Sequence, residues 1–243
     1  MKLGERCYAV TGLTHADLFS VNSGFIVGKD GVILLDSGFS TESAPTIEGY
    51  SAAASGGKPI QNLILLEGHL DHIFAAGYFQ SQGAHIIAYQ GIGLTQKEID
   101  DYVINANDSI GIETRRDNRE AFLYFDQVKP FITDIAVKVD TTLTLCGCQL
   151  EVYLAPGHTK ENIMVYEPHD RVLYAADTMY HRYLLTARFG NAELWQQWLK
   201  TLDLIEKLSP RFIVPGHGRV IEESQVKAAL EHHRRQLHER LNQ

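Results

Sequence analysis

The sequence predicts an α/β fold in which two β-sheets pack face to face and helices cover both outer faces. Short strand-like runs followed by helical spacing occur in the first half of the chain and again in the second, which fits two layers of each kind. Four of the strand-like runs stop at side chains that bind metals well. With 243 residues and 44% hydrophobic content, the chain can bury one large core, and residues 1–243 are expected to form a single domain.

The first half begins with short strands, two of them separated by the turn signal Lys29-Asp30-Gly31. Helical spacing over 41–55 is broken by Gly56-Gly57, and a second helix is expected from near Asp71 to about Gln82. The strands of this half are expected at 7–11, 24–28, 32–35, 60–66 and 84–89.

A mainly helical insertion is expected near 94–130, where it would cap the mouth of a site. The strand pattern then returns, and two helices follow, near 192–207 and over 221–241. The last helix has apolar residues spaced for one buried stripe. Its histidines are expected to be solvated or to cap the helix, namely His232, His233 and His238. The strands of this half are expected at 143–146, 150–154, 163–166 and 172–175.

The most informative stretch is Glu67-Gly68-His69-Leu70-Asp71-His72, which places four metal-binding side chains directly after the apolar run 63–66. Three later strand-like runs end in a similar way, at His158, at Asp177 and at His217. The two later histidines each follow a glycine. The sequence therefore predicts that four strand ends converge on one metal centre.

These motifs, in this order, resemble the signature of the metallo-β-lactamase superfamily, which is His-x-His-x-Asp-His, then Gly-His, then Asp, then Gly-His. The resemblance spans nearly the whole chain. It implies an αββα four-layer sandwich, with two mixed sheets flanked by helices. The chain departs from the pattern at one position, because Glu67 stands where the family usually has its first histidine.

The resemblance implies a site for two divalent metal ions with seven ligands. Glu67, His69 and His158 would hold the first ion, Asp71, His72 and His217 the second, and Asp177 would bridge both. Zinc is the expected metal. Manganese and iron are alternatives because a carboxylate is a harder ligand than imidazole, although zinc also accepts carboxylate oxygen. If the carboxylate at position 67 points away, the first site is weak and the second still works.

Two residues are expected to take part in catalysis. Asp71 is expected to bind metal and also to accept the proton of the attacking water before passing it to the leaving group. Tyr180 lies three residues after Asp177, where the resemblance to lactonases of this superfamily implies a tyrosine that donates a hydrogen bond to the substrate carbonyl. The alternative for Tyr180 is an aromatic residue that only lines the pocket.

Three further residues are expected near the site. Asp36 resembles the family's supporting aspartate at a strand end, and we expect it to order the surrounding loops rather than to bind metal. His15 and His181 are weaker candidates for substrate contact at the mouth of the pocket.

Composition limits the partners. The formal net charge of −8 argues against nucleic acid, so a small-molecule substrate is expected. The chain starts without an apolar leader pattern and has no apolar run long enough for a membrane span, which predicts a cytoplasmic protein unless a leader was trimmed. The cysteines, Cys7, Cys146 and Cys148, are expected to be small core residues in a reducing compartment. The oligomeric state is left open.

The sequence thus predicts a dinuclear hydrolase in which a metal-bound hydroxide attacks the carbonyl of an ester, lactone, thioester or β-lactam-type substrate. Two other classes remain open. One is a di-iron protein on the same fold that reacts with oxygen or nitric oxide. The other is a binding module with a degenerate metal site.

Overall fold

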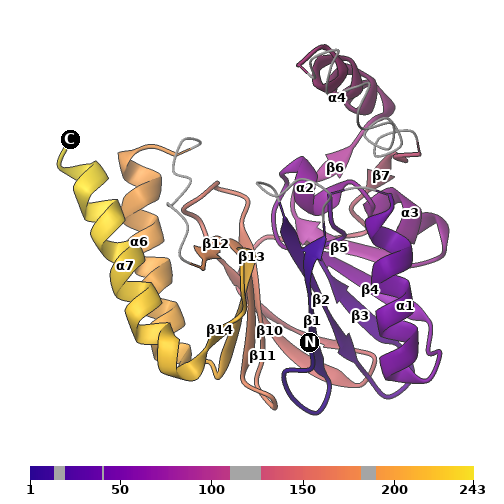
Figure 1. The fold of residues 1–243 in the computed structure, drawn as a ribbon, viewed down its shortest axis with the longest axis horizontal. Coiled ribbons are helices and arrows are strands. Elements are labelled where there is room, and N and C mark those ends of the chain that lie inside the picture. Colours follow the sequence, from indigo (N-terminus) through magenta and orange to yellow (C-terminus); the bar gives the residue numbers. More distant parts are fainter. Residues whose placement is uncertain (14–19, 40, 110–126, 182–189) are drawn as a thin grey trace.

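The computed structural model describes residues 1–13, 20–39, 41–109, 127–181 and 190–243. Within these ranges two sheets pack against each other, and helices lie outside each sheet (Figure 1). This arrangement confirms the predicted αββα sandwich.

The first sheet has the strand order β8-β5-β4-β3-β2, with β1 paired to β2. Its pairs from β3 to β8 are parallel, whereas β2 pairs with β1 and with β3 antiparallel. The strands are β1 (Cys7–Leu13), β2 (Val21–Val27), β3 (Val32–Leu35), β4 (Ile60–Leu65), β5 (His85–Tyr89) and β8 (Ile135–Val137).

The second sheet has the order β13-β12-β11-β10-β9, with β14 paired to β13. Only β12 and β13 are parallel among its described pairs. The strands are β9 (Thr141–Leu145), β10 (Cys148–Leu154), β11 (Ile163–Glu167), β12 (Val172–Tyr180), β13 (Phe212–His217) and β14 (Ile221–Glu222). Among the described strands, the single residue pair Val21 and His217 joins the two sheets.

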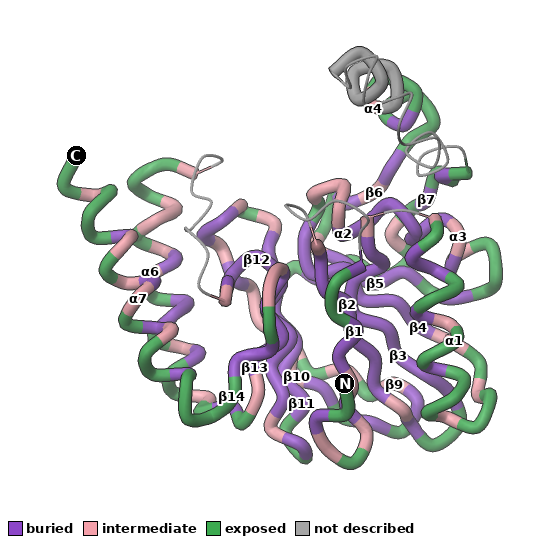
Figure 2. The backbone as a smooth tube through the Cα atoms, viewed as in Figure 1, coloured by how far each residue is buried: buried purple, intermediate pink, exposed green. Residues whose placement is uncertain are grey.

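Helices cover the outer face of each sheet. The first sheet carries α1 (Ser43–Ser55), α2 (Leu70–Ile73) and α3 (Ala76–Ser81), and the second carries α6 (Ala192–Leu208) and α7 (Glu223–Leu241). In Figure 2 the strands are mostly buried, and the helices are exposed on their outer sides. β3, β11 and β12 are buried at every residue, which explains why these strands read as continuous apolar runs rather than alternating ones.

Three apolar clusters fill the spaces between the four layers. The middle cluster joins residues of both sheets, such as Ile64 and Val165. One outer cluster includes Ile47 of α1 and Phe79 of α3. The other outer cluster includes Trp198 of α6, which is fully buried, together with residues of α7. The core thus packs the two sheets against each other, and the sheets in turn position the loops at one end of the molecule.

Two elements differ most from the sequence prediction. The helix expected from Asp71 to Gln82 is interrupted, because Ala75 leaves the helical region with φ −90° and ψ 2° and separates α2 from α3. The strand expected over 172–175 continues to Tyr180 as β12. Asp177 therefore lies within a strand rather than just beyond one.

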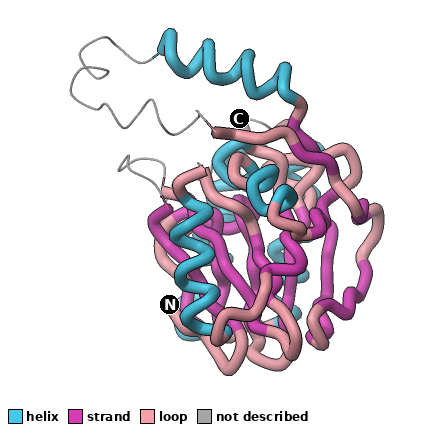
Figure 3. The backbone as a smooth tube through the Cα atoms, turned by 90° about the vertical axis from the view of Figure 1, so that its right-hand side faces the viewer, coloured by secondary structure: helices cyan, strands magenta, loops and turns pink. Residues whose placement is uncertain are grey.

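The predicted insertion begins as a helix. β6 (Gly93–Leu94) pairs with β7 (Phe131–Ile132), and α4 (Gln96–Ser109) projects from the same end of the molecule (Figures 1 and 3). Residues 110–126 lie outside the described residues, so the capping role stays a prediction. None of the described helices has the length and apolar character needed to cross a membrane.

Candidate metal centre

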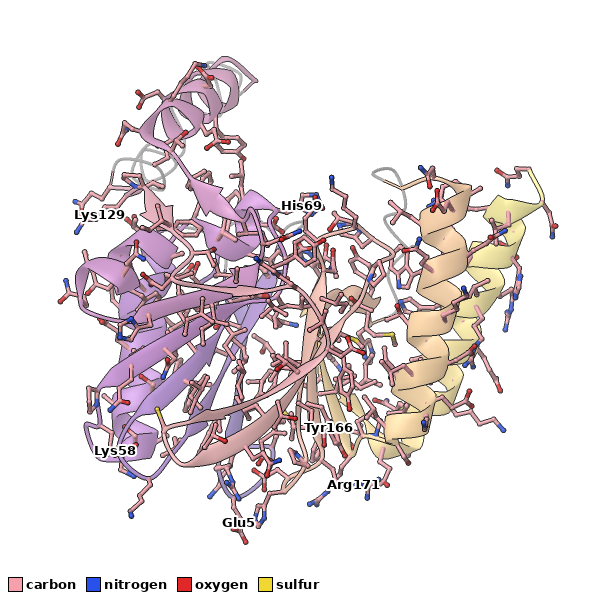
Figure 4. The ribbon with its side chains drawn as sticks, turned by 180° about the vertical axis from the view of Figure 1, so that it is seen from behind. Glu5, Lys58, His69, Lys129, Tyr166 and Arg171 are labelled. Atoms are coloured by element: carbon pink, nitrogen blue, oxygen red, sulfur yellow. The ribbon has the colours of Figure 1, made fainter. Side chains whose placement is uncertain are left out.

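The predicted ligands come from both halves of the sandwich. Glu67 and His69 follow β4 and Asp71 and His72 lie in α2, whereas the other three come from the second sheet: His158 follows β10, Asp177 lies in β12 and His217 ends β13. Figure 4 shows His69 at one end of the molecule, between the two halves. The site therefore lies at the end of the seam where Val21 and His217 pair.

All seven predicted ligands come together in two groups that could each hold a metal ion. In each group the donor atoms lie within 4.8 Å of one another. One group is Glu67, His69, His158 and Asp177, and the other is Asp71, His72 and His217. The grouping follows the expected division for six residues, whereas Asp177, which was expected to bridge both ions, falls in the first group.

Three of the histidines are held so that Nε2 faces the cluster. Nδ1 of His72 donates to Oδ2 of Asp36 at 2.8 Å, and Nδ1 of His217 donates to the carbonyl of Ser20 at 2.8 Å. Nδ1 of His158 lies 3.4 Å from the hydroxyl of Tyr180. A proton on Nδ1 leaves the Nε2 lone pair for a metal, which is how metal-binding histidines are usually oriented.

Two buried polar atoms show that the residues fit a bound cation. Nε2 of His72 and Oδ1 of Asp177 are buried and make no hydrogen bond within the described part of the chain, although they lie 3.4 Å apart. Buried polar atoms without partners are costly. Nε2 of His72 lies 3.0 Å from Oε1 of Glu67, and Oδ1 of Asp177 lies 3.2 Å from Nε2 of His217, so both atoms lie among the other predicted ligands, as they would around bound cations.

The electrostatics of the cluster also favour cations. Burial raises the pKa of Glu67, but the nearby His72 and His69 outweigh this effect and hold the pKa at about 2. Burial lowers the pKa of His217, but the neighbouring carboxylates of Asp177 and Asp71 raise it to about 10. Carboxylates therefore stay charged and draw positive charge into the site.

One side of the cluster is closed and the other is open. Glu67 and His72 have fully buried side chains, and those of His158 and Asp177 are buried. In contrast, the side chains of His69, Asp71 and His217 are 29%, 23% and 17% exposed. Of the predicted ligands, these three border the open side of the cluster.

The two Gly-His motifs are required by close packing. A Cβ atom at Gly216 would collide with the carboxylate of Asp177, and one at Gly157 would collide with the ring of Trp198. The indole of Trp198 also packs against His158 with ring centres 5.9 Å apart. Glycine at these positions lets the following histidine approach the cluster.

Tyr180 lies beside the cluster. Its hydroxyl donates to Oδ2 of Asp177 at 2.7 Å, and its ring is stacked between His217 and His233, at 5.9 and 6.3 Å. The predicted bond from Tyr180 to a substrate carbonyl stays a prediction. His181, which follows it, is half-buried, and its N–H donates to the carbonyl of His217. His15 lies outside the described residues.

Asp36 supports the site, as expected from the sequence. Its Oδ1 accepts from the N–H of Leu66 at 2.7 Å while Oδ2 accepts from His72. Asp36 has φ 56°, a left-handed conformation that Asp tolerates better than most residues. This conformation ends β3 and turns the carboxylate toward the two partners.

Two residues support the site in ways that the sequence prediction did not assign to them. Asn162 is fully buried, and its Nδ2 donates to Oε2 of Glu67 at 3.2 Å. His233 was expected to be solvated or to cap a helix, and this is wrong: it is fully buried, and its Nε2 accepts from the N–H of Tyr180 at 3.1 Å. The apolar stripe of α7 contained the signal, because His233 falls between Leu230 and Leu237 on the buried face.

Comparison with known proteins agrees with this geometry. Residues 16–217 match the sequence profile of the metallo-beta-lactamase superfamily. The chain belongs to this superfamily, whose members are mostly metal-dependent hydrolases.

The chain is also similar to a curated protein, the 2,4-dinitroanisole O-demethylase subunit alpha of Nocardioides sp. (strain JS1661). The two are 27% identical over 195 residues, which cover 79% of this chain and 51% of the relative. The chain thus spans about half the length of this relative.

Solved structures share the fold. A metallo-beta-lactamase family protein from Thermus thermophilus superposes with a TM-score of 0.73 at 20% identity, covering 99% of this chain and 82% of the other. A metallo-beta-lactamase from Pontibacter korlensis superposes with a TM-score of 0.68 at 20% identity, covering 98% and 97%. At this identity the similarity concerns the fold alone.

Proposed function

We propose that the protein is a hydrolase with two divalent metal ions, acting on the carbonyl of an ester, lactone, thioester or β-lactam-type substrate. The convergence of seven potential ligands from both halves of the sandwich, in two groups that could each hold an ion, supports this proposal. Zinc is the proposed metal, with manganese or iron as alternatives. When bound, such a pair of ions lowers the pKa of a water to about 7 and so supplies a hydroxide.

The residues have different proposed tasks. Asp71 lies on the open side, with Oδ2 3.4 Å from Nε2 of His217, where it can accept a proton from the attacking water and pass it to the leaving group. Asp177 faces both halves of the site, because Oδ1 lies 3.2 Å from His217 and Oδ2 lies 3.4 Å from His158. Tyr180 is the proposed donor to the developing oxyanion, for which its hydroxyl would turn from Asp177 to the substrate.

Elemental analysis and a substrate screen test the proposal together. Purified protein should hold two zinc, manganese or iron ions per chain after dialysis, and the loaded protein should turn over a lactone, a thioester, an aryl ester or a β-lactam. If the protein binds two ions but turns over none of these substrates, the proposal of carbonyl hydrolysis is refuted. Bound iron with visible absorption would favour the di-iron alternative, and metal well below one ion per chain would favour a degenerate binding module.

The O-demethylase relative supports a second candidate, the hydrolysis of an activated aryl methyl ether. Water would add its oxygen to the ring carbon, the bond from that carbon to the methoxy oxygen would break, and methanol would leave with a proton. The same proton carrier, Asp71, would serve this reaction. The observation that supports this candidate is the 27% sequence identity to that relative over 79% of this chain.

Product analysis with 2,4-dinitroanisole separates the ether reactions. Hydrolysis yields dinitrophenol and methanol without oxygen. An oxidative route instead consumes oxygen and two electrons from a reductant and yields formaldehyde. Absence of any dinitrophenol from metal-loaded protein, with and without oxygen and reductant, removes this candidate.

A further inference from the structure

Glu67 faces both halves of the metal centre with one oxygen. Its Oε1 lies 3.3 Å from Nδ1 of His69, which belongs to one ligand group, and 3.0 Å from Nε2 of His72, which belongs to the other. The side chain is fully buried. The family pattern assigned this position to a single metal, but the position of Oε1 is common to both groups.

The second oxygen of Glu67 is turned away and held. Oε2 accepts from Nδ2 of Asn162 at 3.2 Å, and its other neighbour, Nε2 of His158, lies farther away at 3.8 Å. A carboxylate bound in this way can rotate little about its last bond.

The orientation of the Asn162 amide is fixed by Thr159. Oδ1 of Asn162 accepts from the N–H of Thr159 at 3.1 Å and also from its hydroxyl. Because the amide oxygen is used by these two donors, the NH₂ group must face Glu67. Asn162 has no exposed surface, so water does not compete for these bonds.

We propose that Asn162 is a positioning residue that makes Glu67 a ligand shared by both metal ions. The amide binds Oε2 and leaves Oε1 between the two ligand groups. The inference rests on the proposed metal centre. It places two carboxylates across the seam, Glu67 through one oxygen and Asp177 through two, and so gives both ions harder ligands than an imidazole at position 67 would.

The position of Asn162 explains how the chain tolerates the departure from the family pattern. An imidazole has a rigid ring, whereas a glutamate side chain rotates about three bonds and needs an outside contact to fix its direction. Hydrogen bonds to metal ligands from outside the coordination sphere are typically worth about 10–100-fold in metal affinity. A loss of that size is the expected effect of removing the amide.

Metal titration of the full-length protein tests the proposal without using activity. Apo wild type and Asn162→Leu are titrated separately with zinc and with manganese, with a competing chelator to give the affinity for the first and second ions. Both affinities should fall by about 10–100-fold in the variant. The matched control is Asn62→Leu, which removes another buried asparagine whose Nδ2 bonds only to Sγ of Cys146 within the described contacts. Its metal affinities should equal those of wild type.

A second pair of variants separates positioning from folding. In the background of Glu67→Ala, the further change Asn162→Leu should have little effect, because its target is gone. An equally large loss in that background would mean that Asn162 acts through the 157–162 turn, and would overturn the proposal. Asn162→Ala replaces the leucine variant if circular dichroism shows that the latter is unfolded.

The remaining outcomes are also decisive. Weakening of only one ion in Asn162→Leu means that Glu67 serves one half of the site, and this overturns the shared role. Unchanged affinities in a protein that binds two ions overturn the inference and leave the proposed function intact. A wild-type protein that binds no ion overturns both.

Discussion

His233 should make the protein less stable in mild acid. The side chain is fully buried between α7 and β12, and both ring nitrogens are used: Nδ1 donates to the carbonyl of Ala229 at 2.8 Å, and Nε2 accepts from the N–H of Tyr180 at 3.1 Å. A second proton would have to bind Nε2, where it would face the N–H of Tyr180, and two donors would then point at each other. Burial accordingly lowers the pKa of His233 from 6.5 to about 4.

The sign of the effect follows from proton binding. In the unfolded chain His233 takes up a proton as the pH falls through 6.5, whereas the folded protein resists until about pH 4. Its contribution to stability is therefore complete above 6.5 and is lost below it. The difference between 6.5 and about 4 corresponds to about 3 kcal/mol in total. Of this, about 2 kcal/mol is lost between about pH 7.5 and about pH 5.

Urea unfolding of wild type and His233→Gln at these two pH values measures the effect. Glutamine can still accept the N–H of Tyr180 but does not titrate. Chelator is present throughout, so metal release does not contribute. Wild type should lose about 2 kcal/mol more than the variant on acidification, and the neighbouring variant His232→Gln should behave as wild type. Equal losses in wild type and His233→Gln would refute the reasoning.

Three further changes probe the site. Asp71→Asn should lower turnover by about 10²–10⁴-fold, beyond any loss of metal measured in parallel; near-normal rates would exclude it as the proton carrier. Glu67→His should raise the affinity for zinc relative to manganese in titrations of apo protein, and an unchanged ratio would mean that Glu67 is not a ligand. Gly216→Ala should cost about 1–3 kcal/mol in thermal or urea unfolding, because the new methyl group meets the carboxylate of Asp177. The control Gly49→Ala, where nothing lies within 4 Å, should not destabilise, and equal effects would show that the packing at Gly216 is loose.

The local patterns of the sequence were enough for the fold and for the grouping of ligands. Each apolar run that ends in a ligand is a strand, so the ends of β4, β10 and β13 could be read in advance. The interruption of the helix at Ala75 could not be predicted, because the apolar spacing of residues 71–82 continues through it.

The supporting residues depend on contacts between distant segments. Asn162 meets Glu67 across 95 positions, and His233 meets Tyr180 across 53. A pattern within one segment does not show which distant atom a polar side chain will meet. For His233, however, the spacing of apolar residues in α7 does place it on the buried face. Its burial could therefore have been predicted from its position in the helix, although histidine is a polar residue type.

Metal ions bound at the seam between the sheets would also help to hold the two sheets together. Four predicted ligands come from the first half of the chain and three from the second, and Val21 with His217 is the single strand pairing between the sheets among the described residues. Ions held there would act as a cross-link between two lobes, in addition to the apolar cluster that packs the two sheets together. Since a ligand that binds only the docked arrangement stabilises it in proportion to the logarithm of its concentration, loss of metal would loosen the lobes at the open end first. The opposite end, where Figure 4 shows Glu5 and Arg171, is tied by Asp170, which accepts the backbone N–H groups of Glu5, Arg6 and Cys7, and would serve as the hinge.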